Sequence, residues 1–198
     1  MSKTLKHDLK ADALLEKGIE LLWSKGYNAT SVNDIVKIAG IPKGSFYFYF
    51  ESKEDFVIKA IDKYFNMMFT PAREILENKS ISPKQRLLDF HEYRVSVLKN
   101  EMGCKMGCMA CNIGNEMAEH NENLRNAILV KEQMILSIIT DTIQEAQDYG
   151  EINNSMKAED LAAFIEDAGK GAMVSMKESQ SSYPIDNVMN MIRNILLK

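Results

Sequence analysis

The sequence PKGSFYFYFESKE at residues 42–54 decides the fold. Before it, Ser31 and Asp34 lie three residues apart and form a capping box, the signature of a helix N-terminus. That helix is expected to end at Gly40, because glycine readily adopts the left-handed conformation that closes a helix. Pro42 then suits the first turn of the next helix. Two short helices joined by a tight turn form the arrangement that can place the second helix in the major groove of DNA.

Five consecutive aromatic residues occupy the middle of this segment. On a helix, residues three and four positions apart share a face, so Phe46, Tyr49 and Phe50 are expected to point to one side. Tyr47 is expected to point elsewhere, and Phe48 to lie between the two directions. A globular core rarely requires such a run. Part of it is therefore predicted to pack in a core, and part to be left for contact with another molecule.

The rest of the chain has the periodicity of helices. Apolar residues recur at three and four positions, and no segment other than the aromatic run alternates as a strand would. Ser52 and Asp55 form another capping box, which opens a long helix that Pro71 must kink or end. Further helices are expected at about 8–24, 82–100, 121–149, 157–177 and 185–197. The chain is predicted to be all-α, with a three-helix head containing the helix-turn-helix at residues 1–51 and a larger helical body at residues 52–198.

Composition excludes several classes of protein. With 198 residues, of which 45% are apolar, the chain can bury a core. It has neither an apolar run of membrane-spanning length nor a signal peptide, so we expect a cytoplasmic location. The net charge of −4 argues against a nucleic-acid binder that relies on bulk positive potential. No catalytic triad order, phosphate loop or helical metal motif is present, so we predict neither an enzyme nor a cofactor.

Residues 43–54 resemble, almost position by position, the motif K-G-x-[FLI]-Y-x-[YH]-F-x-[ST]-K-[ED] of the TetR family of repressors. Residues 26–35 resemble the entry to that family's second helix, whereas the body matches only in its helix pattern. The resemblance implies a transcriptional repressor that acts as a homodimer. Its heads would grip a palindromic operator in double-stranded DNA, and its bodies would release that operator when a small apolar or electrophilic effector binds.

By motif position, the resemblance also implies which head residues contact DNA. They are Ser31, Lys43, Gly44, Ser45, Tyr47, Phe48, Tyr49 and Lys53. Ser31, Tyr49 and Lys53 would hold phosphates. Lys43, Ser45 and Tyr47 would lie nearest the base edges, and Gly44 would let a phosphate approach the backbone closely. Each residue alone also fits an ordinary surface or core role, so the DNA interpretation rests on the register of the whole set.

Small residues that would let another helix approach closely cluster in the helix expected at 157–177. They are Ala162, Ala163, Ala168, Gly169, Gly171 and Ala172. In the resembled family, the last two long helices of each subunit form a four-helix dimer interface. Here these helices would be 157–177 and 185–197. The apolar stripe of the second comprises Val188, Met191, Ile192 and Ile195. The alternative is that all these residues pack within one subunit.

Cys104, Cys108 and Cys111 lie within eight residues, and three interpretations of them stay open. The first is a metal or iron–sulfur sensor, with His120 as a further ligand. Their spacing matches the cluster loop of radical SAM enzymes, but the chain lacks the strands and length of the barrel that those enzymes need. A metal- or redox-binding helical protein without operator specificity is therefore the alternative function. The spacing alone assigns no metal ligand.

The second interpretation is a reactive thiol. A cysteine at a helix N-terminus is biased towards the thiolate by backbone N–H groups, and Cys108 is the candidate. Residues 107–125 look like the corresponding part of redox-sensing members of the family, in which a lysine of the penultimate helix assists the cysteine. Lys177 occupies the matching place. Cys104 and Cys111 depart from that pattern, and would either resolve the oxidised thiol or indicate a different sensing chemistry.

The third interpretation is an ordinary apolar pocket, with the cysteines as small core residues. Candidate apolar lining residues are Phe90, Tyr93, Phe164, Met67, Met68, Met102, Met106, Met109, Met117, Met134 and Met173. Candidate polar groups are His91, Asn112, Glu116 and His120. Methionines at helical spacing are also common in plain cores, so this pattern alone does not locate a pocket.

Overall fold

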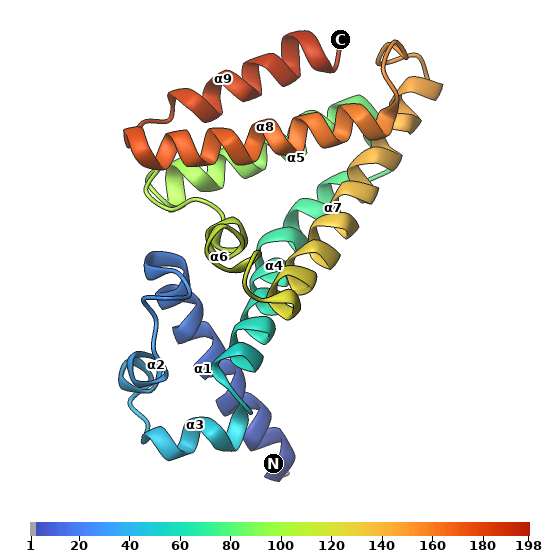
Figure 1. The fold of residues 1–198 in the computed structure, drawn as a ribbon. Coiled ribbons are helices and arrows are strands. Elements are labelled where there is room, and N and C mark those ends of the chain that lie inside the picture. The colour runs from blue at the N-terminus through green and yellow to red at the C-terminus, as the bar shows by residue number, and fades with distance from the viewer. Residues whose placement is uncertain (1–2) are drawn as a thin grey trace. The chain divides into compact units, whose positions relative to one another are not determined.

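A computed structural model describes the backbone of residues 3–198 and the side chains from Leu9 onward. These residues form nine α-helices and two short π-helical segments without any strand, so the all-α prediction is confirmed. In chain order (Figure 1) the elements are α1 (Lys3–Lys25), α2 (Val32–Ala39), α3 (Lys43–Tyr49), α4 (Lys53–Glu77), α5 (Pro83–Ser96), η1 (Val97–Glu101), α6 (Met109–Met117), α7 (Glu122–Asp148), α8 (Ala158–Ser179), α9 (Tyr183–Met191) and η2 (Ile192–Leu196).

Most helix boundaries lie within a few residues of those expected from caps and breakers. Gly40 closes α2 in the left-handed conformation, with φ of 66°. Pro42 is the N-cap of α3 and not a residue of its first turn. Pro71 lies inside α4, so the helix does not end there and continues to Glu77. The helix expected to reach about Asn100 changes at residue 97 into the π-helical segment η1.

The described chain divides into two compact units. The head unit comprises the residues up to Asn66 together with Met109–Val130, and the body unit comprises Met67–Cys108 and Lys131–Lys198. Both α4 and α7 contribute residues to each unit. This division follows contacts in space, and the functional boundary between residues 51 and 52 remains a prediction.

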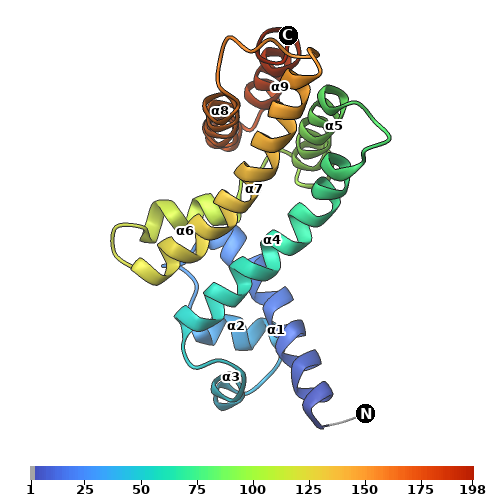
Figure 2. The same cartoon turned by 90° about the vertical axis from the view of Figure 1, so that its right-hand side faces the viewer.

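In the head unit, α2 packs against α1, and α3 packs against α2 (Figure 2). A cluster of aromatic rings lies between α3 and the start of α4. The Phe56 ring lies 5.6 Å from the Phe46 ring and 4.9 Å from the Phe50 ring, measured between centroids. Gly18 makes room for this cluster, because a Cβ atom there would lie only 2.1 Å from the Phe56 ring. The core of the head thus fixes the orientation of α3.

In the body unit, α5, α8 and α9 lie alongside one another. Their apolar faces pack with parts of α4 and α7 into one core, which includes Phe69, Leu87, Phe90, Ile143, Leu161 and Ile165. A smaller cluster of Ala172, Met176 and Ile185 lies where α8 and α9 approach each other. Within the described part of the chain, no helix is long and apolar enough to cross a membrane.

Candidate functional site

Helix α3 presents one packed face and one open face. Phe46 and Phe50 are buried, and Tyr49 is half-buried beside them. Tyr47 is 55% exposed and Phe48 is 68% exposed. The predicted division of the aromatic run is therefore confirmed, except that Phe48 points to solvent and is not intermediate. Two large aromatic side chains on the open face of a short helix are unusual in a helix that only packs.

The polar residues predicted to contact DNA gather at the start of the same helix. Lys43 and Gly44 are exposed in its first turn, and Ser45 is half-buried. A Cβ atom at Gly44 would meet no atom of the described residues within 4 Å. The protein's own packing thus gives no reason for a glycine at this position. Close approach of another molecule to the backbone would explain the glycine, because a side chain there would be in the way.

The N-terminus of α2 is capped as the sequence predicts. The Ser31 hydroxyl accepts a hydrogen bond from the backbone N–H of Asp34, and the Asp34 carboxylate accepts one from the backbone N–H of Ser31 at 2.9 Å. The Ser31 hydroxyl also donates a hydrogen bond to the Asp34 carboxylate. This hydrogen bond, followed by the one from the Ser31 backbone N–H, lowers the pKa of Asp34. Ser31 is exposed, so its hydroxyl stands at a helix N-terminus that an anion can reach.

Lys53 has an intramolecular partner that the sequence did not indicate. Its ammonium group donates a hydrogen bond of 2.6 Å to the carbonyl oxygen of Tyr27 and lies 3.9 Å from the centroid of the Tyr27 ring. Burial lowers the pKa of Lys53, while the nearby Glu116 carboxylate opposes that shift. Lys53 thus fastens α4 to the loop between α1 and α2. A DNA phosphate near Lys53 would accept hydrogen bonds from the N–H groups of the ammonium that do not donate to Tyr27.

Two acidic residues join the end of α6 and the start of α7 to the rest of the head unit. Glu116 accepts hydrogen bonds from the backbone N–H groups of Tyr27 and Asn28. Glu54 of α4 accepts hydrogen bonds from the side-chain amides of Asn123, at 2.8 Å, and Asn121, which together lower its pKa. Sequence reasoning proposed Glu116 as a pocket group and missed Glu54. In the structure both hold the head together.

The cysteine segment leads directly into α6. Cys108 immediately precedes the first residue of that helix, as the reactive-thiol interpretation requires. All three cysteines are half-buried thiols, and Cys104 packs against the small cluster of the body unit. Cys104 also has φ of 59°, a left-handed conformation that is uncommon outside glycine. Among the described residues, no group of three His, Cys, Asp or Glu side chains is placed to hold a metal ion.

Lys177, the predicted assistant of Cys108, is exposed in the last turn of α8. A Cβ atom on Gly107 would lie 3.7 Å from the backbone oxygen of Met173, so the residue before Cys108 packs against α8. Met173 is one helical turn before Lys177. The structure therefore brings the backbone of the cysteine segment to the part of α8 that carries the predicted lysine.

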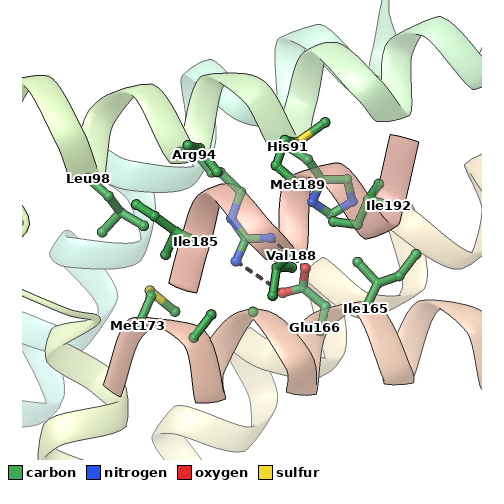
Figure 3. Close-up of a pocket in the computed structure, with 13 residues that line it drawn as sticks. His91, Arg94, Leu98, Ile165, Glu166, Met173, Ile185, Val188, Met189 and Ile192 are labelled. Carbon is green, nitrogen blue, oxygen red and sulfur yellow. Dashed lines mark hydrogen bonds and ion pairs between the residues drawn. The ribbon is translucent and has the colours of Figure 1, made fainter. Parts of the chain in front are cut away.

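The body unit contains a cavity of about 50 Å³ between α5, α8 and α9 (Figure 3). Its wall is largely apolar, with Leu98, Ile165, Met173, Ile185, Val188, Met189 and Ile192 among the lining residues. Three polar side chains also line it, His91 and Arg94 from α5 and Glu166 from α8. The cavity is thus a mostly apolar site with a few convergent polar groups.

Arg94 and Glu166 form a bidentate ion pair at one side of the cavity, with N–O distances of 2.5 and 3.2 Å. Burial alone would raise the pKa of Glu166, but the Arg94 charge and its hydrogen bonds outweigh that effect and hold this pKa below its usual value. The two opposite charges therefore face each other as a neutral pair.

His91 differs from this pair, because its Nε2 atom is buried and has no hydrogen-bond partner among the residues that the structure describes. The residue is only 5% exposed. Burial, and then the Arg94 charge, lower the pKa of His91 to about 4, so the imidazole is neutral at neutral pH. Sequence reasoning named His91 as one of several polar candidates, but no sequence pattern distinguished it from His120, which is exposed.

The other residues predicted to form the effector site are not gathered at this cavity. Phe90 is fully buried in the main core of the body unit, and Tyr93 packs against that core. Asn112 lies half-buried on α6. Phe164, Met67 and Met134 were predicted to line a pocket, but they are 55%, 52% and 37% exposed. Of the predicted methionines, only Met173 is among the residues that line the cavity, where Met189 joins it.

The predicted stripe of the last helix divides into two faces. Val188 and Ile192 line the cavity, whereas Met191 and Ile195 are 43% and 55% exposed. Helix α8 also has an exposed face without polar side chains at three positions, Phe164, Gly171 and Val174. Part of the stripe thus packs within the subunit, as the alternative prediction held. The outward part leaves apolar side chains uncovered on both helices.

Two known protein families together match most of the chain. The family described as bacterial regulatory proteins, tetR family, matches residues 14–60, and the family described as tetracyclin repressor-like, C-terminal domain, matches residues 83–192. The transcriptional regulator AcuR of Cereibacter sphaeroides is 31% identical over 172 residues, which cover 85% of this chain and 77% of the relative. The repressor DhaR of a Mycobacterium species is 28% identical over 184 residues, which cover 93% and 90%.

Solved structures agree with these matches. A crystal structure of a TetR regulatory protein from Rhodobacter sphaeroides superposes with a TM-score of 0.85 at 27% identity and covers 93% of this chain and 97% of its own. The reduced form of Escherichia coli NemR superposes with a TM-score of 0.83 at 22% identity and covers 94% and 96%. The second likeness concerns the fold alone.

Proposed function

The chain belongs to the TetR family of bacterial regulatory proteins, which are transcriptional regulators and not enzymes, and from this premise we propose that it is a sequence-specific repressor. Its dimer binds a palindromic operator and releases it when the body binds a small effector or a thiol is modified. The relatives DhaR and NemR bear the name of HTH-type transcriptional repressors. This supports repression as the sign of regulation.

The observation that carries the DNA-binding proposal is the open face of α3. Lys43, Tyr47 and Phe48 are exposed there around Gly44, whose missing side chain the protein's own packing does not require. In a helix-turn-helix, the N-terminal residues of the second helix contact base edges. Lys43 and Tyr47 would read bases, with Ser45, while Ser31, Tyr49 and Lys53 hold phosphates.

Dimerisation sets the spacing of the two α3 helices, and we assign it to the outward faces of α8 and α9. Phe164 and Val174 on α8 and Met191 and Ile195 on α9 are apolar and exposed. Burial of such a face against its own copy gives an isologous interface with twofold symmetry. That symmetry matches two operator half-sites about one helical turn of DNA apart.

Release requires that the effector favours the DNA-free state. A shift from 1:99 to 99:1 takes about 5.5 kcal/mol of differential binding. A covalent adduct on Cys108 would supply it. The thiolate would add to an activated alkene, so that the S–C bond forms, the C=C double bond opens and the neighbouring carbon takes a proton from water. The position of Cys108 directly before α6 supports this part of the proposal.

The experiment measures fluorescence anisotropy with the DNA immediately upstream of the gene, before and after treatment with N-ethylmaleimide. Wild type, Cys108→Ser and the matched control Cys104→Ser are compared. Loss of binding in wild type and Cys104→Ser, but not in Cys108→Ser, supports Cys108 as the sensor. Unchanged binding in all three proteins refutes the thiol proposal and leaves a reversible ligand. If upstream DNA binds no better than an unrelated fragment at low salt, the repressor proposal itself is wrong.

A further inference from the structure

We propose that the cavity between α5, α8 and α9 is a reversible effector site and that its ligand is a small neutral molecule with one carbonyl or hydroxyl group on an apolar body. The role as an effector site rests on the proposed repressor function. The binding of such a ligand at His91 does not depend on the repressor function, because it follows from the residues of the cavity alone.

The buried nitrogen of His91 indicates a ligand with a polar group. Buried polar atoms nearly always have a hydrogen-bond partner, and each exception calls for an explanation. Nε2 of His91 is buried, has no hydrogen-bond partner in the described part of the chain and belongs to a side chain that lines the cavity (Figure 3). A ligand oxygen in the cavity would complete this hydrogen bond. A carbonyl would accept it, and a hydroxyl could either donate or accept it.

The charges that line the cavity favour a neutral ligand. Arg94 and Glu166 already form two hydrogen bonds with each other, so the polar side of the cavity has no unbalanced charge. The neutral His91 adds none. An ionic ligand would lose its hydration without gaining a partner of opposite charge, and such burial is strongly unfavourable. A neutral ligand avoids this cost.

The volume of the cavity favours a small ligand. The cavity measures about 50 Å³, whereas a cavity of about 150 Å³ holds benzene. The part of the ligand that lies inside the cavity would therefore have roughly two to four non-hydrogen atoms in the present conformation. Met173 and Met189 line the cavity and are flexible, so their movement could admit a longer apolar chain. The polar end of the ligand would still meet His91.

The test uses five compounds that share four non-hydrogen atoms: acetone, 2-propanol, isobutene, acetate and isopropylammonium. NMR follows the His91 imidazole nitrogen and the methyl groups of Met173 and Met189 in the full-length protein. The His120 imidazole and the methyl group of Met134 serve as internal controls, because both residues are exposed. Acetone and 2-propanol are expected to give saturable shifts at the three cavity probes, with millimolar Kd values, and none at the controls.

Variants test the role of His91. His91→Leu keeps a side chain of similar size, and His120→Leu is the matched surface control. In His91→Leu, acetone and 2-propanol should bind at least tenfold more weakly, whereas isobutene should not. Equal binding of acetone by His91→Leu and wild type would overturn the proposal. Saturation by acetate or isopropylammonium alone, or no saturable shift with any neutral compound, would also overturn it.

The effector role has a separate readout. Saturating acetone or 2-propanol should lower the affinity for upstream DNA at least tenfold in wild type and in His120→Leu, but not in His91→Leu. If the ligand binds at His91 and DNA affinity stays unchanged, the cavity is not an effector site. If the protein has no DNA affinity at all, the repressor proposal fails, while the NMR titrations still decide whether the cavity binds neutral ligands.

Discussion

The carboxylate of Glu116 accepts a hydrogen bond of 2.8 Å from the backbone N–H of Asn28, 88 residues away in the sequence. The adjacent N–H of Tyr27 donates to the same carboxylate at 3.2 Å. Glu116 lies in α6, which begins directly after Cys108. The loop that leads to α2 is thus tied to the helix that follows the cysteine segment.

Removal of this contact should destabilise the head. Glu116→Ala leaves the partly buried N–H of Tyr27 without its acceptor, and we expect a loss of about 1–2 kcal/mol in the free energy of unfolding. Urea denaturation followed by circular dichroism measures it. Glu119→Ala removes an exposed carboxylate nearby in sequence and should change stability by less than about 0.5 kcal/mol. Equal stabilities of the two variants would contradict the structural role of Glu116.

Gly44→Ala separates folding from DNA binding. A methyl group there meets no described atom within 4 Å, so the variant should fold and gain about 0.5–1 kcal/mol from its helix propensity. Gly114→Ala, inside α6, is the matched control, because its methyl group makes only an ordinary 3.7 Å contact. In anisotropy titrations, Gly44→Ala should bind the operator at least tenfold more weakly and Gly114→Ala should bind as wild type. Wild-type affinity in both would argue against close approach of DNA at Gly44.

Lys43→Ala should weaken binding in a salt-dependent way. If its ammonium group neutralises one DNA phosphate, the slope of log K against log salt should fall in magnitude by about 0.9. If it instead reads a base, the loss should be specific to the operator and amount to about 1–3 kcal/mol. Lys157→Ala, an exposed lysine of the body unit, is the control. No change in either slope or specificity would remove Lys43 from the interface.

The parts of the fold that sequence predicted depend on local interactions. The capping box at Ser31 and the left-handed Gly40 involve residues within a few positions of each other, so their spacing determines them. The burial of Phe46 and Phe50 follows from helical periodicity in the same way. Phe48 was placed less well, because an intermediate position on a helix becomes buried or exposed only when its neighbours are known.

The features that sequence reasoning missed depend on how distant helices pack. Nothing around Glu116 or Asn28 indicates that they meet across 88 positions. The cavity has its polar groups on α5 and α8, and Glu166 has no sequence signal that links it to Arg94. Phe90 and Tyr93 are adjacent to His91 and Arg94 in sequence, but the turn of the helix directs Phe90 into the core and His91 to the cavity.

Phe164→Glu should convert the dimer into monomers. Phe164 is 55% exposed in the isolated subunit. In a symmetric interface, the Phe164 ring of each of the two subunits would be buried. Loss of both rings should cost about 3 kcal/mol or more, before the repulsion between the introduced charges. Light scattering after size-exclusion chromatography measures the mass. Tyr149→Glu, at another aromatic residue that is 71% exposed, should remain dimeric. A dimeric Phe164→Glu protein would refute the proposed interface.

The buried His91 should make stability depend on pH between 4 and 6.5. Its pKa is lowered to about 4 in the folded protein from 6.5, so between these values the unfolded chain binds more protons than the folded one. Stability from this residue is therefore complete above pH 6.5 and is lost as pH falls towards 4, by about 3 kcal/mol in total. Glu166, with a pKa below its usual 4.5, loses its contribution at lower pH still. Urea midpoints at pH 7.5, 6.5, 5.5 and 4.5 measure the effect.

His91→Leu should be the more stable protein at pH 7.5, because it removes an unpartnered buried nitrogen, and its stability should fall less steeply with acid. His120→Leu should follow wild type, since that residue is exposed. Parallel pH profiles for His91→Leu and wild type would mean that His91 is protonated or solvated in the folded protein, and the neutral cavity would then lose its physical basis.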